Sequence, residues 1–333
     1  MSATIKLEKK HFPVLLDELI SIISPLYGGT FIDCTFGQGG YSKEILKNKN
    51  NKIIALDRDK ETLKISKIFE KKYGNRFRYQ NITFKEIDKF KFENNLKGIL
   101  FDLGFSTNQI NDPKKGISFK SKGKLNMCMG LNNFSAEDVI NNLDFNYLTK
   151  IFKFFGEEKK AKIISKKIIF ERKKKILKTE DLVKIIDWAY KGKRKKIHNS
   201  TKVFQALRIF VNQEIGQLIY GLINAFKILP IGGVIAVVTF HSLEDKIVKF
   251  FFKNYSEDKN YSRYLPQKIS KKQIFNFSNK KTIIPTKKEI EINPASRSAK
   301  LRFAHKINHS DDFNDFIKKF NYLIKIENLS DKI

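Results

Sequence analysis

A chain of 333 residues is long enough for one large domain or two ordinary ones, and a hydrophobic content of 41% is enough for a sizeable core. Its longest apolar runs, such as residues 234–240, are too short to cross a bilayer, and residues 1–10 lack the apolar stretch of a signal peptide. Because Cys34 and Cys128 are the only cysteines, a disulfide framework and an all-cysteine zinc site are excluded. We therefore expect a protein of the reducing cytoplasm without a membrane anchor.

The charge balance is strongly basic. The formal net charge is +30, from 65 Lys and Arg residues against 35 Asp and Glu residues. A field of this sign favours a polyanionic partner, above all a nucleic acid. Abundant Lys, Asn and Ile are also typical of an AT-rich coding sequence, but that bias alone does not create an imbalance of this size. Nucleic acid is therefore the favoured partner.

The first hundred residues alternate strand-like and helix-like runs. Residues 12–23 predict a helix with Pro13 in its opening turn, and residues 30–36 predict a strand that leads through a Gly-rich loop to a helix from about Tyr41. Further strands are predicted at 52–56, 77–81 and 98–103, with a helix at 61–72. Strands that alternate with helices in this way indicate a parallel α/β sheet.

The alternation stops at about residue 111 and resumes after residue 203. The intervening text is polar, helical and rich in lysine. A crossover between neighbouring parallel strands needs only about a dozen residues besides its helix, so an inserted helical domain is the economical explanation. The predicted division is a sheet domain from residues 1–110 and 204–333, and an inserted helical domain from residues 111–203.

The chain after the insert completes the sheet pattern. A long amphipathic helix is predicted over 204–229, followed by a buried strand over 234–239. Residues 298–307 alternate apolar side chains with Lys300 and Arg302, which predicts a half-exposed edge strand.

The strongest local motif is the Gly-rich loop Thr35-Phe-Gly-Gln-Gly-Gly-Tyr-Ser42. Gly37, Gly39 and Gly40 lie between a strand and a helix, where a ligand that approaches the backbone requires residues without a Cβ. The spacing is not the G-x-G-x-x-G of dinucleotide sites, which weakens a pyrophosphate interpretation. Asp57 ends the next strand, where an acid accepts hydrogen bonds from ribose hydroxyls. The alternative is an ordinary tight turn followed by a solvated acid.

Asp102 ends another predicted strand, at the sheet edge where open α/β sheets bind ligands. The exocyclic amine of a nucleobase is a poor nucleophile because its lone pair is delocalised into the ring. A carboxylate and a backbone carbonyl that accept both N–H bonds would help this amine to pyramidalise and lose a proton. Asp102 and the Leu103 carbonyl are candidates for that pair. Alternatively, Asp102 contacts only a cofactor.

His241 follows the strand at 234–239 and faces the same predicted edge. It is a candidate to position or deprotonate a substrate group. The alternative is structural: Ser242 would cap a helix whose first turn carries Glu244 and Asp245, and no active site is then needed.

Three weaker candidates remain. Arg297, Lys300 and Arg302 lie among hydroxyl residues and suit RNA phosphates, although a turn that enters a solvated strand explains them equally well. The lysine run at 159–178 either faces an RNA backbone or is a soluble helix surface. Cys128 has no basic or histidine neighbour in the sequence that would activate a thiolate, so we interpret it as a packing residue. No His, Cys or Asp cluster has convincing metal-ligand spacing, so no residue is assigned to a metal site and metal use stays open.

Taken together, the motifs resemble those of the RsmH (MraW) family of 16S ribosomal RNA methyltransferases over nearly the whole chain. The matching blocks are His11-x-Pro13-Val-Leu15, Thr35-Phe-Gly-Gln-Gly-Gly-Tyr-Ser42, Asp57-Arg-Asp59, Asp102-Leu-Gly-Phe-Ser-Thr-Asn-Gln109, Gly116-Ile-Ser-Phe119, Gly156-Glu-Glu158, Phe204-Gln-Ala-Leu-Arg-Ile209, Phe240-His-Ser-Leu-Glu-Asp245 and Asn293-Pro-Ala-Ser-Arg-Ser-Ala-Lys-Leu-Arg302. Because several blocks occur in the right order, the resemblance is much more specific than any one motif.

The resemblance implies an α/β fold with a Rossmann-like S-adenosylmethionine (SAM) dependent, class I methyltransferase sheet and an inserted helical substrate-recognition domain. It implies N4-methylation of a cytidine in the decoding centre of 16S rRNA, within the small ribosomal subunit. By similarity, the residues that bind SAM would be Gly39, Gly40, Tyr41, Asp57, Phe84, Asp102 and Gln109.

The chain departs from the family at five positions. Tyr41 stands where the family usually has His, a change that a backbone contact would survive. Asn111 replaces an Asp, and Asn126, Cys128 and Gly130 replace the Asp, Arg and Asp of a Leu-Asp-Met-Arg-Met-Asp run. These changes favour one alternative, a catalytically weak RNA-binding assembly factor. A second alternative, a DNA amino-methyltransferase, is disfavoured because Asp102-Leu-Gly-Phe105 lacks the two prolines of that motif.

Overall fold

The computed structural model describes residues 13–23, 25–90, 95–106, 109–110, 112–120, 122–192, 198–256, 273–277 and 282–333. The motif residues His11, Thr107 and Asn108 and the departure at Asn111 therefore lie outside the described residues. Within the described ranges, no helix combines the length and the apolar character needed to span a bilayer.

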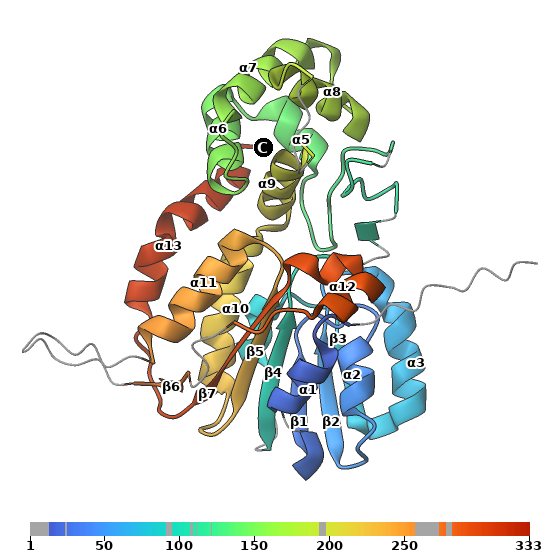
Figure 1. The fold of residues 1–333 in the computed structure, drawn as a ribbon, viewed down its shortest axis with the longest axis vertical. Coiled ribbons are helices and arrows are strands. Elements are labelled where there is room, and N and C mark those ends of the chain that lie inside the picture. The colour runs from blue at the N-terminus through green and yellow to red at the C-terminus, as the bar shows by residue number, and fades with distance from the viewer. Residues whose placement is uncertain are drawn as a thin grey trace, which may run out of the picture.

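Among the described residues, seven strands form one sheet in the order β3-β2-β1-β4-β5-β7-β6 (Figure 1). The first five are parallel, whereas β7 pairs antiparallel with β5, and β6 pairs antiparallel with β7. The strands are β1 (Gly29–Asp33), β2 (Asn51–Leu56), β3 (Phe77–Gln80), β4 (Leu96–Asp102), β5 (Val234–Thr239), β6 (Phe275–Asn276) and β7 (Lys300–Lys306). The strands predicted at 30–36, 52–56, 77–81, 98–103 and 234–239 are thus confirmed, with ends that differ by up to three residues.

Helices cover both faces of the sheet. Successive residues of each strand point to opposite sides, and apolar residues on both sides pack against helices. In β5, Val234, Ala236 and Val238 pack with one set of helices, and Ile235 and Val237 pack with the other. The first set is α1 (Leu16–Ile23), α2 (Gly40–Ile45) and α3 (Leu63–Tyr73), and the second is α10 (Glu214–Ile228), α11 (Ser242–Asn254) and α13 (Asn314–Glu327). The result is a three-layer α/β/α architecture.

Short helices complete the connections. One α-helix, α12 (Lys287–Ile292), lies after the fifth strand in sequence and packs near the loop that precedes β7. The 3-10 helices are η1 (Pro25–Tyr27), η2 (Lys60–Thr62), η3 (Gly74–Arg76), η4 (Phe84–Lys89), η5 (Arg172–Lys174), η6 (Pro294–Ser298) and η7 (Asn328–Lys332). The helix predicted at 61–72 is therefore η2 followed by α3.

The first helix begins later than predicted. Pro13 and Val14 precede it, Leu15 has a left-handed φ of 53°, and α1 starts only at Leu16. The Leu15 N–H donates to the Glu289 carboxylate of α12 at 2.8 Å, which is a tertiary partner that no local sequence signal announces.

The single long helix predicted over 204–229 is wrong. The structure has two helices, α9 (Thr201–Asn212) and α10, separated at Gln213, which is left-handed with φ 50° and ψ 41°. The Glu327 carboxylate of α13 accepts the Ile215 and Gly216 N–H groups at 2.8 and 2.7 Å, so a distant residue caps the start of α10. Because neither Gly nor Pro stands at Gln213, the helical spacing of apolar residues continues across the break and does not predict it.

The strand predicted at 298–307 is confirmed as β7, but its predicted position at the edge of the sheet is wrong. β7 lies between β5 and β6 rather than at the edge. Arg302 is buried and its Nε donates to Asp245 of α11 at 2.7 Å, while Lys306 is buried and donates to the Phe226 and Leu229 carbonyls at 2.8 and 2.7 Å. Arg302 therefore neutralises an acid and Lys306 the carbonyl end of α10 instead of facing water.

In the described part of the chain between β4 and α9, the helices α5 to α8 form a lobe beyond the carboxyl ends of the parallel strands (Figure 1). They are α5 (Ala136–Asn142), α6 (Phe145–Phe154), α7 (Ala161–Glu171) and α8 (Thr179–Ala189). The lobe shares one continuous apolar core with the α10 side of the sheet, and α9 packs against both α5 and α6. This packing fixes the lobe relative to the strand ends.

Candidate active site

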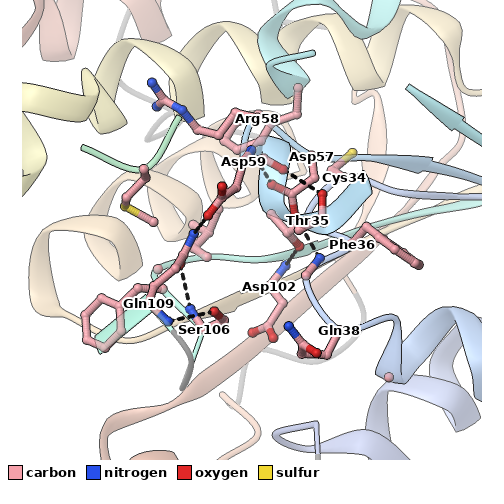
Figure 2. Close-up of a pocket in the computed structure, with 18 of the residues that line it drawn as sticks. Cys34, Thr35, Phe36, Gln38, Asp57, Arg58, Asp59, Asp102, Ser106 and Gln109 are labelled. Carbon is pink, nitrogen blue, oxygen red and sulfur yellow. Dashed lines mark hydrogen bonds between the residues drawn. The ribbon is translucent and has the colours of Figure 1, made fainter. Parts of the chain in front are cut away.

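A cavity of about 530 Å³ lies at the carboxyl ends of β1, β2 and β4 (Figure 2). Six of the predicted site residues line it: Gly40, Tyr41, Asp57, Phe84, Asp102 and Gln109. Residues from the inserted lobe and from α9 and α10 complete the wall, among them Met129, Asn212 and Gln217. The cavity therefore lies between the sheet and the lobe, at the edge where open α/β sheets bind ligands.

The Gly-rich loop is held in place by the acid that ends the next strand. Asp57 accepts the Gly37 N–H on one carboxylate oxygen and the Asp59 N–H on the other, both at 2.8 Å. Burial raises the pKa of Asp57 to about 6, although these two hydrogen bonds oppose the rise. Asp57 thus fixes the loop as well as lining the cavity.

The three glycines serve different purposes. Gly37 lines the cavity with φ 50°, and a Cβ there would meet no atom closer than 3.9 Å. A Cβ at Gly39 would lie 2.5 Å from the Phe69 ring, and one at Gly40 would lie 2.2 Å from Pro13. At Gly39 and Gly40, therefore, the missing side chain makes room for neighbouring protein groups rather than for a ligand alone.

The Asp102 carboxyl group is the most unusual polar group of the cavity. Its backbone N–H donates to Thr35 Oγ1 at 2.7 Å, and its side chain points away from Thr35 (Figure 2). Oδ1 is buried and has no hydrogen-bond partner among the described residues. Burial, with the nearby carboxylates of Asp33 and Glu244, raises the pKa of Asp102 to about 8. Among the described residues that line the cavity, Asp102 Oδ1 and Gln217 Oε1 are the buried side-chain atoms without a partner, and each can accept a hydrogen bond from a bound ligand.

Phe84 and Gln109 both line the cavity and both contact neighbouring protein groups. The Phe84 ring packs edge-on against Phe101, with ring centroids 5.4 Å apart. Gln109 donates from Nε2 to Asp59 at 2.6 Å and accepts the Ser106 N–H at 2.9 Å. Both side chains are thus pre-oriented by protein neighbours.

Tyr41 is buried at the start of α2, and its hydroxyl donates to the Val14 carbonyl at 2.5 Å. This contact attaches the Gly-rich loop to the segment before α1.

His241 lies beside the cavity rather than in its wall. It is the N-cap of α11, one residue before Ser242, the cap of the structural alternative, and its Nδ1 accepts the Glu244 N–H at 3.3 Å. Its Nε2 lies 3.0 Å from Glu244 Oε1, and it lines a second cavity of about 330 Å³ that shares Phe240 with the first. Glu244, for which no sequence motif predicted a catalytic role, is the member of this capping box that lines the first cavity.

A buried ion pair lies next to this capping box. Arg208 on α9 donates from Nε and Nη2 to the two carboxylate oxygens of Glu214, each at 2.8 Å, and its guanidinium lies 5.0 Å from the Phe105 ring centroid. Arg208 and Glu214 belong to different helices, so the break at Gln213 creates the pair. No motif spacing predicted it.

The side-chain oxygen and nitrogen atoms of Glu214, His241 and Glu244 that could ligate a metal ion lie within 4.8 Å of one another. The spacing of these residues in the sequence did not predict this group. Glu214 is already paired with Arg208, and Glu244 accepts the Phe240 N–H at 2.8 Å. The group is therefore best described as a network of ion pairs and hydrogen bonds.

Two of the three basic residues of the last motif form ion pairs with an acid of the protein itself. Lys300 and Arg302 both donate to Asp245, at 2.9 and 2.7 Å, and lower the pKa of that acid against the opposing effect of its burial. Arg297 is exposed and borders the second cavity. Of the three predicted phosphate contacts, Arg297 is exposed, and the Lys300 side chain is 41% exposed although it pairs with Asp245.

The departures at 126, 128 and 130 form a close turn against the segment after β2. Asn126 accepts the Cys128 N–H at 3.2 Å, and the Cys128 thiol donates to the Phe134 carbonyl at 3.3 Å. Burial raises the pKa of Cys128 to about 11, which agrees with its interpretation as a packing residue. The Gly130 carbonyl accepts Nε and Nη2 of Arg58 at 3.1 and 3.0 Å.

We expect Gly130→Asp, which reintroduces the side chain usual in the family, to destabilise this protein by about 1–3 kcal/mol. Gly130 has φ 98°, and a Cβ there would lie 2.2 Å from the Arg58 carbonyl oxygen, so the backbone must shift. The measurement is the free energy of unfolding in urea. Asn126→Asp is the matched control, because it keeps the oxygen that accepts the Cys128 N–H; equal stability of both variants would contradict the steric argument.

The parallel order β3-β2-β1-β4-β5 with an antiparallel β7, together with the Gly-rich loop and acidic strand ends around one cavity, defines a Rossmann-like, SAM-dependent methyltransferase. The chain belongs to the MraW methylase family, whose model matches residues 8–307.

Known relatives match the chain over most of its length. It is 41% identical over 307 residues to the ribosomal RNA small subunit methyltransferase H of Orientia tsutsugamushi strain Ikeda, covering 90% of this chain and 98% of that protein. It is 41% identical to the enzyme of the same name from Agrobacterium fabrum, covering 88% of this chain and 86% of that protein. A solved structure of a putative rRNA methylase from Clostridium thermocellum aligns with a TM-score of 0.40 at 12% identity, over 90% of this chain and 99% of that one.

Proposed function

We propose that this enzyme transfers a methyl group from SAM to the exocyclic N4 of a cytidine in the decoding centre of 16S rRNA, in the small ribosomal subunit of the cytoplasm. The observation that carries the proposal is the buried, unpartnered Asp102 carboxyl oxygen beside the Gly-rich loop. The names of the relatives support an rRNA substrate, and the net charge of +30 supports a polyanionic one.

The cavity suits SAM in size and in its polar groups. A volume of about 530 Å³ lies within the range of small-molecule sites, and the carboxyl groups of Asp57 and Asp102 can accept hydrogen bonds from ribose hydroxyls and an ammonium group. The residues that would hold SAM are Gly39, Gly40, Tyr41, Asp57, Phe84, Asp102 and Gln109. When bound, SAM supplies an electrophilic methyl group on a sulfonium, so no covalent enzyme intermediate is needed.

Asp102 would act on the cytosine amine. Its ionised carboxylate and the Leu103 carbonyl would accept hydrogen bonds from the two N–H groups of N4 and turn the lone pair out of the ring plane. As the bond from N4 to the methyl carbon forms, the methyl–sulfur bond would break, the thioether would leave, and the proton that N4 loses would pass to the Asp102 carboxylate. Leu103 lines the cavity next to Asp102, which supports this pairing. Because N4 carries two hydrogens, two adjacent acceptors match it better than one.

His241 would position the Glu244 carboxylate rather than deprotonate the substrate. Its imidazole contacts Glu244 from both ring nitrogens, whereas Glu244 lines the cavity. His241 lowers the pKa of Glu244 against the desolvation of that buried carboxyl group, which keeps a negative charge near Asp102. We therefore place His241 behind Glu244.

The inserted helical domain, residues 111–203, would bind the RNA around the target nucleotide, while residues 1–110 and 204–333 carry the SAM site. The lobe borders the cavity through Met129 and carries the lysine run on α7 and the segment after it. This arrangement lets the lobe hold RNA while the nucleotide enters the cavity.

The test is methyl transfer from labelled SAM to unmodified small subunits, followed by nucleoside mass spectrometry of the recovered rRNA. The expected product is N4-methylcytidine at a single decoding-centre site. A second function, an RNA-binding assembly factor of low activity, is favoured by the loss of Arg and Asp side chains at Cys128 and Gly130. SAM binding without any labelled nucleoside would support that second function.

We expect kcat/KM at limiting SAM to rise with pH and to level off above about 8. The ionised carboxylate of Asp102 is the acceptor, and its pKa is raised to about 8, so each pH unit below that value removes most of the active form. The measurement is the pH–rate profile at saturating subunits. A wild-type profile that is flat between about pH 6 and 9 would contradict the assignment.

A further inference from the structure

Two large aromatic side chains are exposed on neighbouring helices of the lobe. Phe170 on α7 is 63% exposed, and Trp188 on α8 is 57% exposed. Neither lines the cavity around Asp102. Single exposed apolar residues need no explanation, but two that share a neighbour form a patch.

One ammonium group joins the two rings. Lys167 Nζ lies 5.0 Å from the ring centroid of Phe170 and 4.7 Å from that of Trp188, while it also pairs with Glu171 at 2.6 Å. The Lys167 side chain is only 22% exposed, because the rings cover it. The rings are therefore fixed next to each other by cation–π contacts, and we call Lys167, Phe170 and Trp188 the aromatic platform.

The surroundings of the aromatic platform are basic. Residues 161–192 contain ten Lys and Arg side chains against four Asp and Glu side chains. Lys173 Nζ lies 5.8 Å from the Phe170 ring centroid, and Lys184, one helical turn before Trp188, has a 74% exposed side chain. The platform thus offers aromatic faces within a positive field.

We propose that the aromatic platform binds unpaired bases of an RNA strand, which stack on Phe170 and Trp188 while the surrounding lysines contact the phosphates. Aromatic faces among basic side chains are what single-stranded nucleic acid requires, whereas bases inside a duplex are already stacked and out of reach. A protein partner fits less well, because protein interfaces are depleted in lysine. The inference deepens the proposed function and rests on its RNA substrate.

The position of the platform gives it a distinct role. α7 and α8 lie at the end of the lobe farthest from the sheet (Figure 1), so the platform would hold a segment of RNA other than the methylated nucleotide. Such a contact changes the affinity for the substrate but leaves the chemical step unchanged.

The chain offers a direct reporter, because Trp188 is its only tryptophan. The experiment titrates the full-length protein with an unstructured oligoribonucleotide and follows tryptophan fluorescence. We expect saturable quenching and, in Phe170→Ala, binding weakened by about tenfold. In methyl transfer to small subunits, Trp188→Ala should raise KM about tenfold at unchanged kcat and SAM affinity, and Trp188→Phe should restore most of the loss.

Tyr27→Ala is the matched control, since Tyr27 is 92% exposed in η1 at the opposite edge of the sheet from the cavity. Absence of quenching, or a wild-type KM in Trp188→Ala, would overturn the inference.

A Trp188→Ala variant that binds naked rRNA normally but binds assembled subunits weakly would also overturn it, because the platform would then contact a protein. A wild-type protein that quenches with RNA but methylates no nucleoside would refute the proposed function and leave the platform standing.

Discussion

Asp102→Asn should lower the rate of methyl transfer by about 10²- to 10⁴-fold, the range that general acid–base assistance supplies. The amide keeps the size of the side chain and the backbone contact to Thr35, but it presents an NH₂ group in place of one of the carboxylate oxygens. A donor that faces the N4 amine repels it instead of accepting its proton. The measurement is single-turnover methyl transfer to small subunits.

Binding measurements separate this effect from a loss of structure. RNA affinity and the melting temperature of Asp102→Asn should stay close to wild type, and so should those of Asp17→Asn, an exposed control on α1. Asp102→Ala should lose methylation in the same way, while RNA binding persists. Retained turnover in either Asp102 variant would remove Asp102 from the catalytic role and leave it a cofactor contact.

The acids at the ends of strands were the part of the site that the sequence predicted best. Asp57 and Asp102 each follow a run of buried residues, and parallel strands carry such residues to one edge of the sheet. The Gly-rich loop was found for the same reason, since a strand, a turn and a helix follow one another within a few residues. Local signals sufficed because each depends only on its neighbours in the chain.

Partners that come from distant segments were not predictable in this way. The break at Gln213 depends on Glu327, more than a hundred residues later in the chain, and the burial of Arg302 depends on Asp245. The same holds for Thr35, whose hydroxyl accepts the Asp102 N–H from a neighbouring strand. Sequence periodicity records how an element faces the core, but it does not record which charged or polar group another element brings to it.

The break between α9 and α10 leads to the second large effect, because it places Glu214 against Arg208. We expect Arg208→Met to destabilise the protein by about 3–5 kcal/mol, since removal of one partner from a buried pair leaves the other charge uncompensated. Arg208 is 7% exposed, and Glu214 and Glu244 would both lose its positive charge. A loss of this size is a large part of a typical total stability of about 5–15 kcal/mol.

Urea denaturation of three variants distinguishes a charge effect from lost packing. Arg208→Met with Glu214→Leu should recover much of the stability, because both charges then leave the apolar interior together. Lys47→Met, which removes an exposed pair with Glu44 whose lysine side chain is 67% exposed, should change the free energy of unfolding by no more than about 0.5 kcal/mol. If the double variant is no more stable than Arg208→Met, the guanidinium stabilises the protein through its packing on Phe105, and the charge argument fails.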